Sequence, residues 1–226
     1  MMYHLVRALI NLAIRVFTRV EATGLENVPK QGAFIAAANH LGRLDVPLVY
    51  YLLKRDDVVM LVAEKYQKYA WARWLAKVLD ATFVNRFNAD LQALRRVFNQ
   101  LKRGGAMVIA PEGTRSHNRA LIQGWAGAGY LAARSGVPVV PVAVTGTEDD
   151  LVVAQLRRLR RPRLVVRIGK PFCLPPLNSR EREKQLQEHT DEIMCRIAAL
   201  LPSEYRGVYA EHPRLHSILQ ESAQTL

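Results

Sequence analysis

The chain has 226 residues, and 32 lysines and arginines against 20 aspartates and glutamates give it a formal net charge of +12. Half of its residues are hydrophobic, so it can bury a sizeable core and is not disordered as a whole. Its two cysteines exclude a disulfide-rich secreted scaffold and favour a reducing compartment. No Cys/His cluster has zinc spacing, so we expect no metal site. The positive charge favours an anionic partner, namely nucleic acid, an anionic membrane surface or a phosphorylated substrate.

Residues 1–22 predict an amphipathic helix at a membrane interface. Their uncharged stretches are shorter than the roughly 20 residues that span a bilayer, and they lack the cleavage site of a signal peptide. Arg7, Asn11, Arg15 and Arg19 recur every four positions beside a wide apolar surface. We expect Arg7, Arg15 and Arg19 to contact an anionic membrane surface, which would make the protein peripheral or monotopic. The alternative is a helix that packs on its own domain.

Residues 23–205 alternate short apolar runs with helical patterns. The expected strands lie at 33–38, 58–62, 82–84, 106–110, 137–144 and 164–168, and the expected helices at 46–54, 66–79, 89–103, 120–135 and 180–201. This alternation predicts a single α/β domain with a largely parallel or mixed central sheet flanked by helices. Residues 206–226 are interpreted as a C-terminal tail. The basic stretch RRLRRPR at 157–163 is interpreted as a solvated connection before a strand, with a binding site as the alternative.

Three loops follow strand-like runs, and ligands of α/β sheets gather at the carboxyl ends of strands. The first loop, NHLGRLD at 39–45, holds a histidine and an aspartate. If Asp45 folds back onto His40, its carboxylate fixes the imidazole tautomer and leaves the other ring nitrogen free to accept a proton. The alternative is that Asp45 caps the following helix, with Pro47 in the first turn.

The second loop carries Arg86 in the block TFVNR, and the third is PEGTRS at 111–116. Arginines after strands can bind a phosphate through two nitrogens, although a surface arginine or a salt-bridged turn is the alternative. Glu112 could position Arg115 or accept a substrate hydroxyl. The pattern GAGYLA at 127–132 resembles a dinucleotide-binding loop, but no suitable strand precedes it. Its small residues instead predict a helix that packs closely on the sheet.

Together these loops resemble the glycerophosphate acyltransferase family, specifically the 1-acylglycerol-3-phosphate acyltransferases. The matching blocks are NHLGRLD, TFVNR, PEGTRS and VPVVPVAVTGT at 137–147, with GLENVP at 24–29 and IGKPF at 168–172 beside them. The resemblance covers roughly residues 20–205. It implies that a fatty acyl group passes from acyl-CoA or acyl carrier protein to a lysophospholipid hydroxyl. Phosphatidic acid would be the product, formed on the cytoplasmic face of a membrane and without a cofactor.

The resemblance also assigns roles to residues. His40 would be the general base, oriented by Asp45. The acceptor phosphate would be bound by Arg86, Glu112, Gly113, Thr114 and Arg115. Pro138 and Pro141 would lie on the acyl side. Oxyanion donors are expected, with backbone N–H groups of the 39–45 loop as candidates.

The sequence departs from the family pattern at Asp80, where a glycine is usual, at Ala110, where phenylalanine is usual, and at Trp125-Ala126, where a basic pair is common. These departures leave open which lipid is the acceptor and which acyl chain is transferred. Other interpretations are a related acyltransferase with a different acceptor, a nucleic-acid-binding protein and a catalytically silent membrane adaptor. The dispersed basic residues disfavour nucleic acid, and the His40/Asp45 pair disfavours the adaptor.

Overall fold

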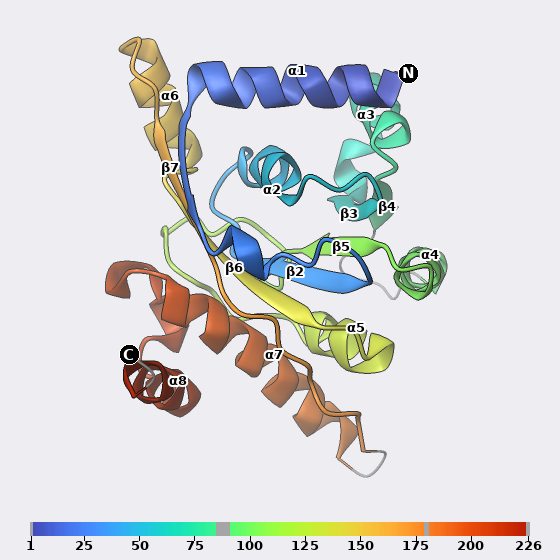
Figure 1. Cartoon of the computed structure of the whole chain (residues 1–226), viewed down its shortest axis with the longest axis vertical. Helices are drawn as coiled ribbons and strands as arrows, with labels where there is room; N and C mark the ends of the chain where they lie inside the picture. The colour runs from blue at the N-terminus through green and yellow to red at the C-terminus, as the bar shows by residue number, and fades with distance from the viewer. Residues whose placement is uncertain (1, 85–90, 179–180, 225–226) are drawn as a thin grey trace.

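A mixed seven-stranded sheet lies between two layers of helices (Figure 1). The computed structural model describes residues 2–84, 91–178 and 181–224. The sheet order is β1-β7-β6-β2-β5-β3-β4, and neighbouring strands are parallel except for the antiparallel pair β6 and β7. The strands are β1 (Arg19–Thr23), β2 (Phe34–Ala38), β3 (Val58–Ala63), β4 (Thr82–Val84), β5 (Ala106–Ile109), β6 (Val139–Thr145) and β7 (Arg163–Ile168). The α/β architecture predicted from the sequence is confirmed.

The helices divide between the two faces of the sheet. One face is covered by α1 (Met2–Phe17), α2 (Asp45–Leu53), α3 (Ala70–Val78) and, toward one end, α6 (Asp149–Arg157). The other face is covered by α4 (Leu91–Lys102), α5 (Gly127–Ser135), α7 (Arg182–Leu200) and α8 (Pro213–Ala223). Short 3-10 turns lie at Leu25–Asn27, Glu64–Tyr66, Ser203–Tyr205 and Gly207–Tyr209. Among the described residues, no helix has the length and apolar character that crossing a membrane requires.

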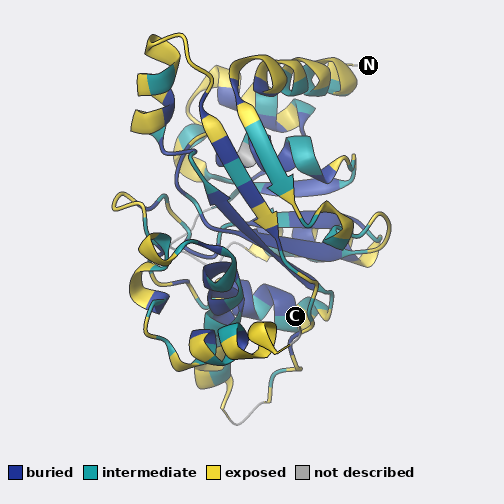
Figure 2. Ribbon diagram, turned by 60° about the vertical axis from the view of Figure 1, so that its left-hand side comes forward, coloured by how far each residue is buried: buried dark blue, intermediate teal, exposed yellow. Residues whose placement is uncertain are grey.

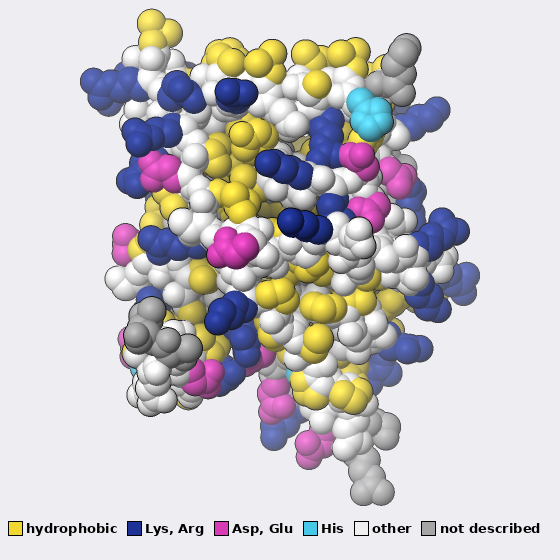
Figure 3. Space-filling view, in the orientation of Figure 1, with side chains coloured by type: hydrophobic (Ala, Val, Ile, Leu, Met, Phe, Trp, Pro, Cys, Tyr) yellow, Lys and Arg dark blue, Asp and Glu magenta, His cyan; other side chains and the backbone are white. Residues whose placement is uncertain are grey.

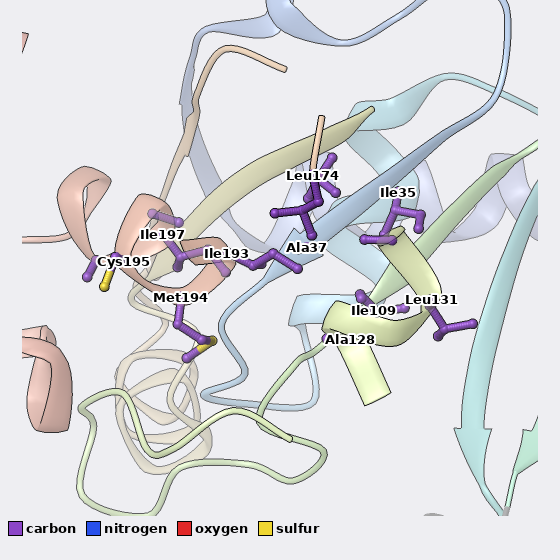
Figure 4. Close-up of a cluster of buried hydrophobic side chains, with 14 of the residues drawn as sticks. Ile35, Ala37, Ile109, Ala128, Leu131, Leu174, Ile193, Met194, Cys195 and Ile197 are labelled. Carbon is purple, nitrogen blue, oxygen red and sulfur yellow. The ribbon is translucent and has the colours of Figure 1, made fainter. Parts of the chain in front are cut away.

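The central strand β2 is buried on both sides. All five of its residues are buried, as Figure 2 shows for the middle of the sheet. Because side chains alternate across a strand, Ile35 and Ala37 join the core beneath α5 and α7, while Phe34 and its alternate neighbours join the core beneath α2. Figure 4 shows Ile35 and Ala37 together with Ile193 and Ile197 of α7 in one cluster. Continuous burial explains why the sequence of β2 reads as an unbroken apolar run.

Some expected elements differ in the structure. The helix expected over 120–135 begins only at Gly127, because the preceding segment hydrogen-bonds to the C-terminal region instead. There the N–H of Leu121 donates to the carbonyl of Tyr205 at 2.9 Å. The start expected for the helix at 89–103 lies outside the described residues. The strand β1 and the helices α6 and α8 were not expected, and α8 lies in the segment interpreted as a tail, where it buries Leu215 and Ile218 against the domain.

The small residues at 127–132 pack on a second helix as well as on the sheet. A Cβ at Gly129 would stand 2.5 Å from the carbonyl oxygen of Leu186 in α7, so only glycine permits this approach. The N–H of Gly129 also donates to Oγ1 of Thr190 at 3.1 Å. Ala128 and Ala132 join the core against the sheet as expected, and Gly129 in addition permits close contact with α7.

Helix α1 packs on the domain through one face and exposes the other. Arg7 faces inward, where it pairs with Asp56 and lies 5.1 Å from the centre of the Tyr50 ring. Its side chain is 13% exposed, so the prediction that Arg7 contacts a membrane is wrong. Arg15 and Arg19 are exposed, and Arg19 forms an ion pair with Glu21. Arg7 can face inward because the carboxylate of Asp56, in the loop after α2, compensates its positive charge.

Candidate active site

His40 and Asp45 meet at the carboxyl end of β2. Nδ1 of His40 lies 2.7 Å from Oδ2 of Asp45. The same oxygen accepts the N–H groups of Leu41 at 2.7 Å and Gly42 at 2.9 Å, so the carboxylate folds back into the loop instead of capping α2. The alternative in which Asp45 is the helix cap is excluded, because Leu44 occupies that position. A tight loop thus brings together two residues that would diverge on a helix.

The geometry favours one tautomer of His40. An ionised carboxylate accepts hydrogen bonds, so Nδ1 carries the proton and Nε2 has a free lone pair. No described residue forms a hydrogen bond with Nε2, and the His40 side chain is 22% exposed. Asp45 is 5% exposed, which keeps water from competing for its contact with the imidazole. The arrangement can therefore accept a proton from a group that approaches from solvent.

Glu112 fixes the backbone of the histidine loop. It is fully buried, and its Oε1 accepts the N–H of His40 at 2.9 Å while Oε2 accepts the N–H of Ile122 at 3.1 Å. The carbonyl of His40 accepts the N–H of Ser116 at 2.8 Å, so both backbone groups of His40 are bound by the 111–116 loop or its carboxylate. Burial raises the pKa of Glu112 to about 7, against the lowering effect of its two backbone donors.

Glu112 thus lies beneath the site and does not contact Arg115. Because both carboxylate oxygens already accept backbone N–H groups, the interpretation that Glu112 positions Arg115 is wrong. Its assignment to the acceptor phosphate stays a prediction, although a buried carboxylate repels a phosphate unless it is protonated.

Asp149 is the residue that holds Arg115. Nη1 of Arg115 donates to Oδ2 of Asp149, and the N–H of Arg43 donates to Oδ1 at 2.9 Å. Asp149 therefore connects the 39–45 loop to the 111–116 loop from the first residue of α6. The sequence analysis missed this role of Asp149. In the sequence, Asp149 is only the middle one of three consecutive acidic residues after a strand, and nothing marks it as a partner of Arg115.

Two glycines of the site loops, Gly42 and Gly113, lie very close to other parts of the chain. A Cβ at Gly42 would stand 1.7 Å from the carbonyl oxygen of Thr147, so glycine is required where the two loops cross. Gly113 has a φ of +64°, and the indole ring of Trp125 lies within 3.2 to 3.9 Å of the position that its Cβ would occupy. Trp125 itself is 60% exposed. An exposed aromatic ring therefore stands over the third loop, in place of the basic pair common in the family.

The oxyanion donors expected from the 39–45 loop are engaged elsewhere. The N–H groups of residues 40 to 43 all donate to the carboxylates of Glu112, Asp45 or Asp149. Asn39 makes two further bonds, to the carbonyl of Val144 at 2.8 Å and to its N–H at 2.7 Å. These contacts make the loop rigid but leave those four donors unavailable to a substrate oxygen.

The remaining predicted residues take different positions. Arg86 lies outside the described residues. Thr114 is exposed on the third loop, beside Gly113. Pro138 precedes β6, and Pro141 lies within β6. Pro141 pairs in register with Ala37 of the neighbouring strand β2, and Ala37 is three positions before His40 in the sequence. The roles of Arg86, Thr114 and the two prolines stay predictions.

An open cavity of about 620 Å³, with mainly apolar walls, lies between β1 and the far end of α2. Its lining residues include Ala22, Leu25 and Leu52, together with the basic residues Lys30 and Lys54. Figure 3 shows a hollow with hydrophobic walls and basic side chains below α1. Helix α2 connects this cavity to the site, because it begins at Asp45 and its nine residues rise about 13 Å.

These features define the chain as an α/β protein with a histidine–carboxylate site at the carboxyl edge of its sheet. A family model described as Acyltransferase matches residues 19–145, which are more than half of the chain and contain both loops of the site that the structure describes. The chain therefore belongs to the acyltransferase family.

Known proteins similar to the chain share this assignment. A probable 1-acyl-sn-glycerol-3-phosphate acyltransferase of Mycoplasma pneumoniae is 29% identical over 174 residues, covering 71% of this chain and 63% of that protein. The 1-acyl-sn-glycerol-3-phosphate acyltransferase of Saccharomyces cerevisiae is 29% identical over 176 residues, covering 75% and 55%. The crystal structure of the 1-acyl-sn-glycerophosphate acyltransferase PlsC from Thermotoga maritima matches with a TM-score of 0.63 and 25% identity, covering 84% of this chain and 77% of that one. The chain spans 47% to 63% of the length of the first curated relatives.

Proposed function

We propose that the protein transfers a fatty acyl group from an acyl thioester to the free hydroxyl of 1-acylglycerol-3-phosphate, giving phosphatidic acid for phospholipid synthesis. The observation that carries the proposal is the contact of 2.7 Å between His40 and Asp45, with Nε2 turned away from any described partner. The names of the similar proteins support the choice of acceptor.

The chemistry needs one base and no covalent enzyme intermediate, because a thioester is already activated. Nε2 of His40 takes the proton of the acceptor hydroxyl while its oxygen bonds to the thioester carbonyl carbon. The tetrahedral intermediate then expels the thiolate, and the imidazolium returns its proton to the sulfur. The carboxylate of Asp45 stabilises the transient positive charge on His40.

Two described arginines, Arg43 and Arg115, lie close to His40 and contact the same carboxylate of Asp149, and we propose Arg115 as the partner of the acceptor phosphate. Arg115 follows Glu112 by three positions, and Asp149 directs its guanidinium between the two loops. A phosphate that approaches from solvent can share this guanidinium with Asp149, because arginine presents five donors in a fixed plane. Arg86 is proposed as a second partner on the evidence of the sequence alone.

The cavity at the far end of α2 is proposed to accept an acyl chain. The cavity lies about 13 Å from the start of α2, which is the length of that helix. An extended fatty acyl chain of common length is longer than this distance and can therefore reach from the site to the cavity. Ala22→Phe should narrow the cavity and shift the preferred donor toward shorter chains, and Ala199→Phe on the opposite face of the sheet serves as a control for added bulk. An unchanged chain-length profile for Ala22→Phe would place the acyl chain elsewhere.

We also propose that the protein docks peripherally on the cytoplasmic face of a membrane through the outer face of α1. The exposed apolar residues of this helix, each between 50% and 59% exposed, are Met2, Leu5, Leu9, Leu12, Val16 and Phe17. Helix α3, which lies near the N-terminal end of α1 in Figure 1, carries two exposed tryptophans, Trp71 at 61% and Trp74 at 48%. An exposed apolar helix face of this kind suits the interface of a bilayer, from which both amphiphilic substrates are reached.

The proposed reaction is tested with purified full-length protein, radiolabelled acyl-CoA or acyl carrier protein, and a panel of lysophospholipids in mixed detergent micelles. Preferred acylation of 1-acylglycerol-3-phosphate supports the proposal. Acylation of another lysolipid at a higher kcat/KM would assign a different acceptor to the same site. Absence of acyl transfer to every acceptor would refute the proposed activity.

A further inference from the structure

The turn that connects α6 to β7 projects from the end of the molecule where α1 lies (Figures 1 and 3). At its tip, Leu159 is 97% exposed. The residues around it, Arg157, Arg158 and Arg160, are exposed as well. These four residues are called the α6–β7 turn below. An apolar side chain at the tip of a basic turn has no role in the core of its own domain.

The conformation of Leu159 is unusual for its residue type. The N–H of Leu159 donates to the carbonyl of Leu156 and the N–H of Arg160 donates to that of Gln155, both at 2.9 Å. This pair of bonds forms a Schellman motif, in which the residue after the helix cap is left-handed and is most often glycine. Leu159 has a φ of +54°, so a leucine occupies a position that favours glycine and gains no packing there.

The two residues that follow the α6–β7 turn, Arg161 and Pro162, are hydrogen-bonded to the end of α1 and the start of β1. Arg161 donates from Nη2 to the carbonyl of Arg15 at 2.7 Å and from Nε to the carbonyl of Thr18 at 3.0 Å. The N–H of Arg19 donates to the carbonyl of Pro162 at 2.8 Å. The turn and the outer face of α1 therefore keep a fixed relation and can meet one surface together.

The charges of the turn are not neutralised within the described part of the chain. Arg157, Arg158 and Arg160 form no ion pair with any described residue, whereas nearby Arg163 pairs with Glu21. Guanidinium groups bind phosphate oxygens, and an apolar side chain between them reaches the acyl region below. No aromatic residue stands among these arginines, so the turn lacks the stacking platform of a single-stranded nucleic-acid site.

We propose that the α6–β7 turn is a second membrane contact, in which Leu159 enters the acyl boundary of an anionic bilayer while Arg157, Arg158 and Arg160 bind lipid phosphates. The inference rests on the proposed docking of α1, and together the two contacts fix the orientation of the domain on the bilayer. It does not depend on acyl transfer.

Sedimentation of full-length protein with vesicles tests the contact. Leu159→Gly removes the side chain but retains the turn, since glycine is the usual residue in that position. We expect binding to phosphatidylglycerol-containing vesicles to fall by about tenfold. Replacing Arg157, Arg158 and Arg160 by glutamine should weaken binding to these vesicles on the order of 100-fold and weaken binding to phosphatidylcholine vesicles much less, because those vesicles carry no net negative charge.

A matched control removes the same charge elsewhere. Lys102, Arg103 and Arg134 are exposed near α4 and α5, away from α6 in Figure 1. Their replacement by glutamine should leave vesicle binding close to that of the wild type. Equal weakening by both triple variants would show that only net charge matters, and wild-type binding by Leu159→Gly would show that the tip does not insert. Either result overturns the inference.

A fluorescent label reports insertion directly. In a Cys173→Ser background, where Cys195 is buried, an NBD label at Leu159→Cys should shift to the blue and gain intensity with anionic vesicles. The same label at Glu211→Cys, whose parent side chain is 93% exposed, should not change. Equal responses at both sites, or a response at 159 to DNA or RNA but not to vesicles, would overturn the inference. Acyl transfer in micelles, measured separately, distinguishes its failure from failure of the proposed reaction.

Discussion

His40 and Glu112 are 72 positions apart, and the backbone N–H of His40 donates to Oε1 of Glu112 at 2.9 Å. The buried carboxylate thus holds the residue that we propose as the base, while Asp45 holds its side chain. Backbone and imidazole of His40 are fixed by two different carboxylates. The contact with Glu112 and the contact with Asp45 can therefore be tested separately.

Replacing the imidazole should abolish most turnover. His40→Ala is expected to lower kcat by about 10²- to 10⁴-fold with the fold intact, because it removes the group that we propose takes the hydroxyl proton. Asp45→Asn should also lose activity, since an amide can hold the wrong tautomer. His216→Ala, on the exposed side of α8, is the control. A folded His40→Ala protein with near-normal turnover would contradict the proposed mechanism.

Replacing Glu112 by glutamine should disturb the site without changing its shape. Both backbone groups that contact Glu112 are donors, so the amide NH₂ of Glu112→Gln must face one of them. We expect a loss of about 1–3 kcal/mol in the free energy of unfolding and a lower kcat with little change in KM for the lysophospholipid. A selective rise in that KM would instead support the phosphate-binding role predicted from the family.

Because the pKa of Glu112 is raised in the folded protein, its contribution to the free energy of unfolding decreases as the pH rises. Its pKa of about 7 in the folded protein lies above the ordinary 4.5, so the folded state binds more protons between these values. The contribution of Glu112 is therefore fully present below about pH 4.5 and is lost as the pH rises to about 7. Denaturant unfolding at several pH values should show the wild type losing stability relative to Glu112→Gln across this window. A parallel pH dependence of the two proteins would argue against the raised pKa.

The arginine of the third loop should matter for its shape as well as its charge. Arg115→Lys keeps the charge but cannot contact Asp149 and a phosphate in the same planar arrangement. We expect KM for the lysophospholipid to rise by about tenfold or more, with the dependence on acyl-CoA unchanged, because one charge-assisted bond contributes roughly 1.5–3 kcal/mol. Arg119→Lys, in the more exposed pair with Asp150, is the matched control. A change confined to the acyl-CoA dependence would assign Arg115 to the donor site.

The outer face of α1 is best tested by point substitutions. Deleting residues 1–20 would also remove buried Ile14 and the start of β1, so a loss of binding would not identify the contact. Replacing Leu5, Leu9 and Leu12 by glutamine should lower vesicle partitioning by roughly 100-fold, at about 1 kcal/mol for each half-exposed leucine. The exposed pair Leu91 and Val208, changed to glutamine, provides a control elsewhere. High salt should weaken the wild-type contact only in part, because salt does not screen the apolar contribution.

The sequence by itself determined the features that depend on neighbours along the chain. The five-residue spacing of His40 and Asp45 indicated their contact, because a carboxylate can fold back within one loop and bind the imidazole, but the structure was needed to exclude Asp45 as a helix cap. Alternating apolar runs and helical periods likewise predicted the α/β sheet, since burial on both faces requires continuous apolar strands. Local patterns missed β1, whose sequence RVEAT is largely polar and pairs only at the sheet edge.

The tertiary structure alone decided which distant groups meet. Nothing near Glu112 in the sequence shows that it binds the backbone of His40, and nothing near Arg115 shows that Asp149 is its partner. The stripe of Arg7, Asn11 and Arg15 could not reveal that Arg7 turns inward to Asp56 while the leucines face outward. The physical reason is that a charged group takes its partner from whatever the packed sheet brings within hydrogen-bond distance, and sequence spacing carries no information about that distance.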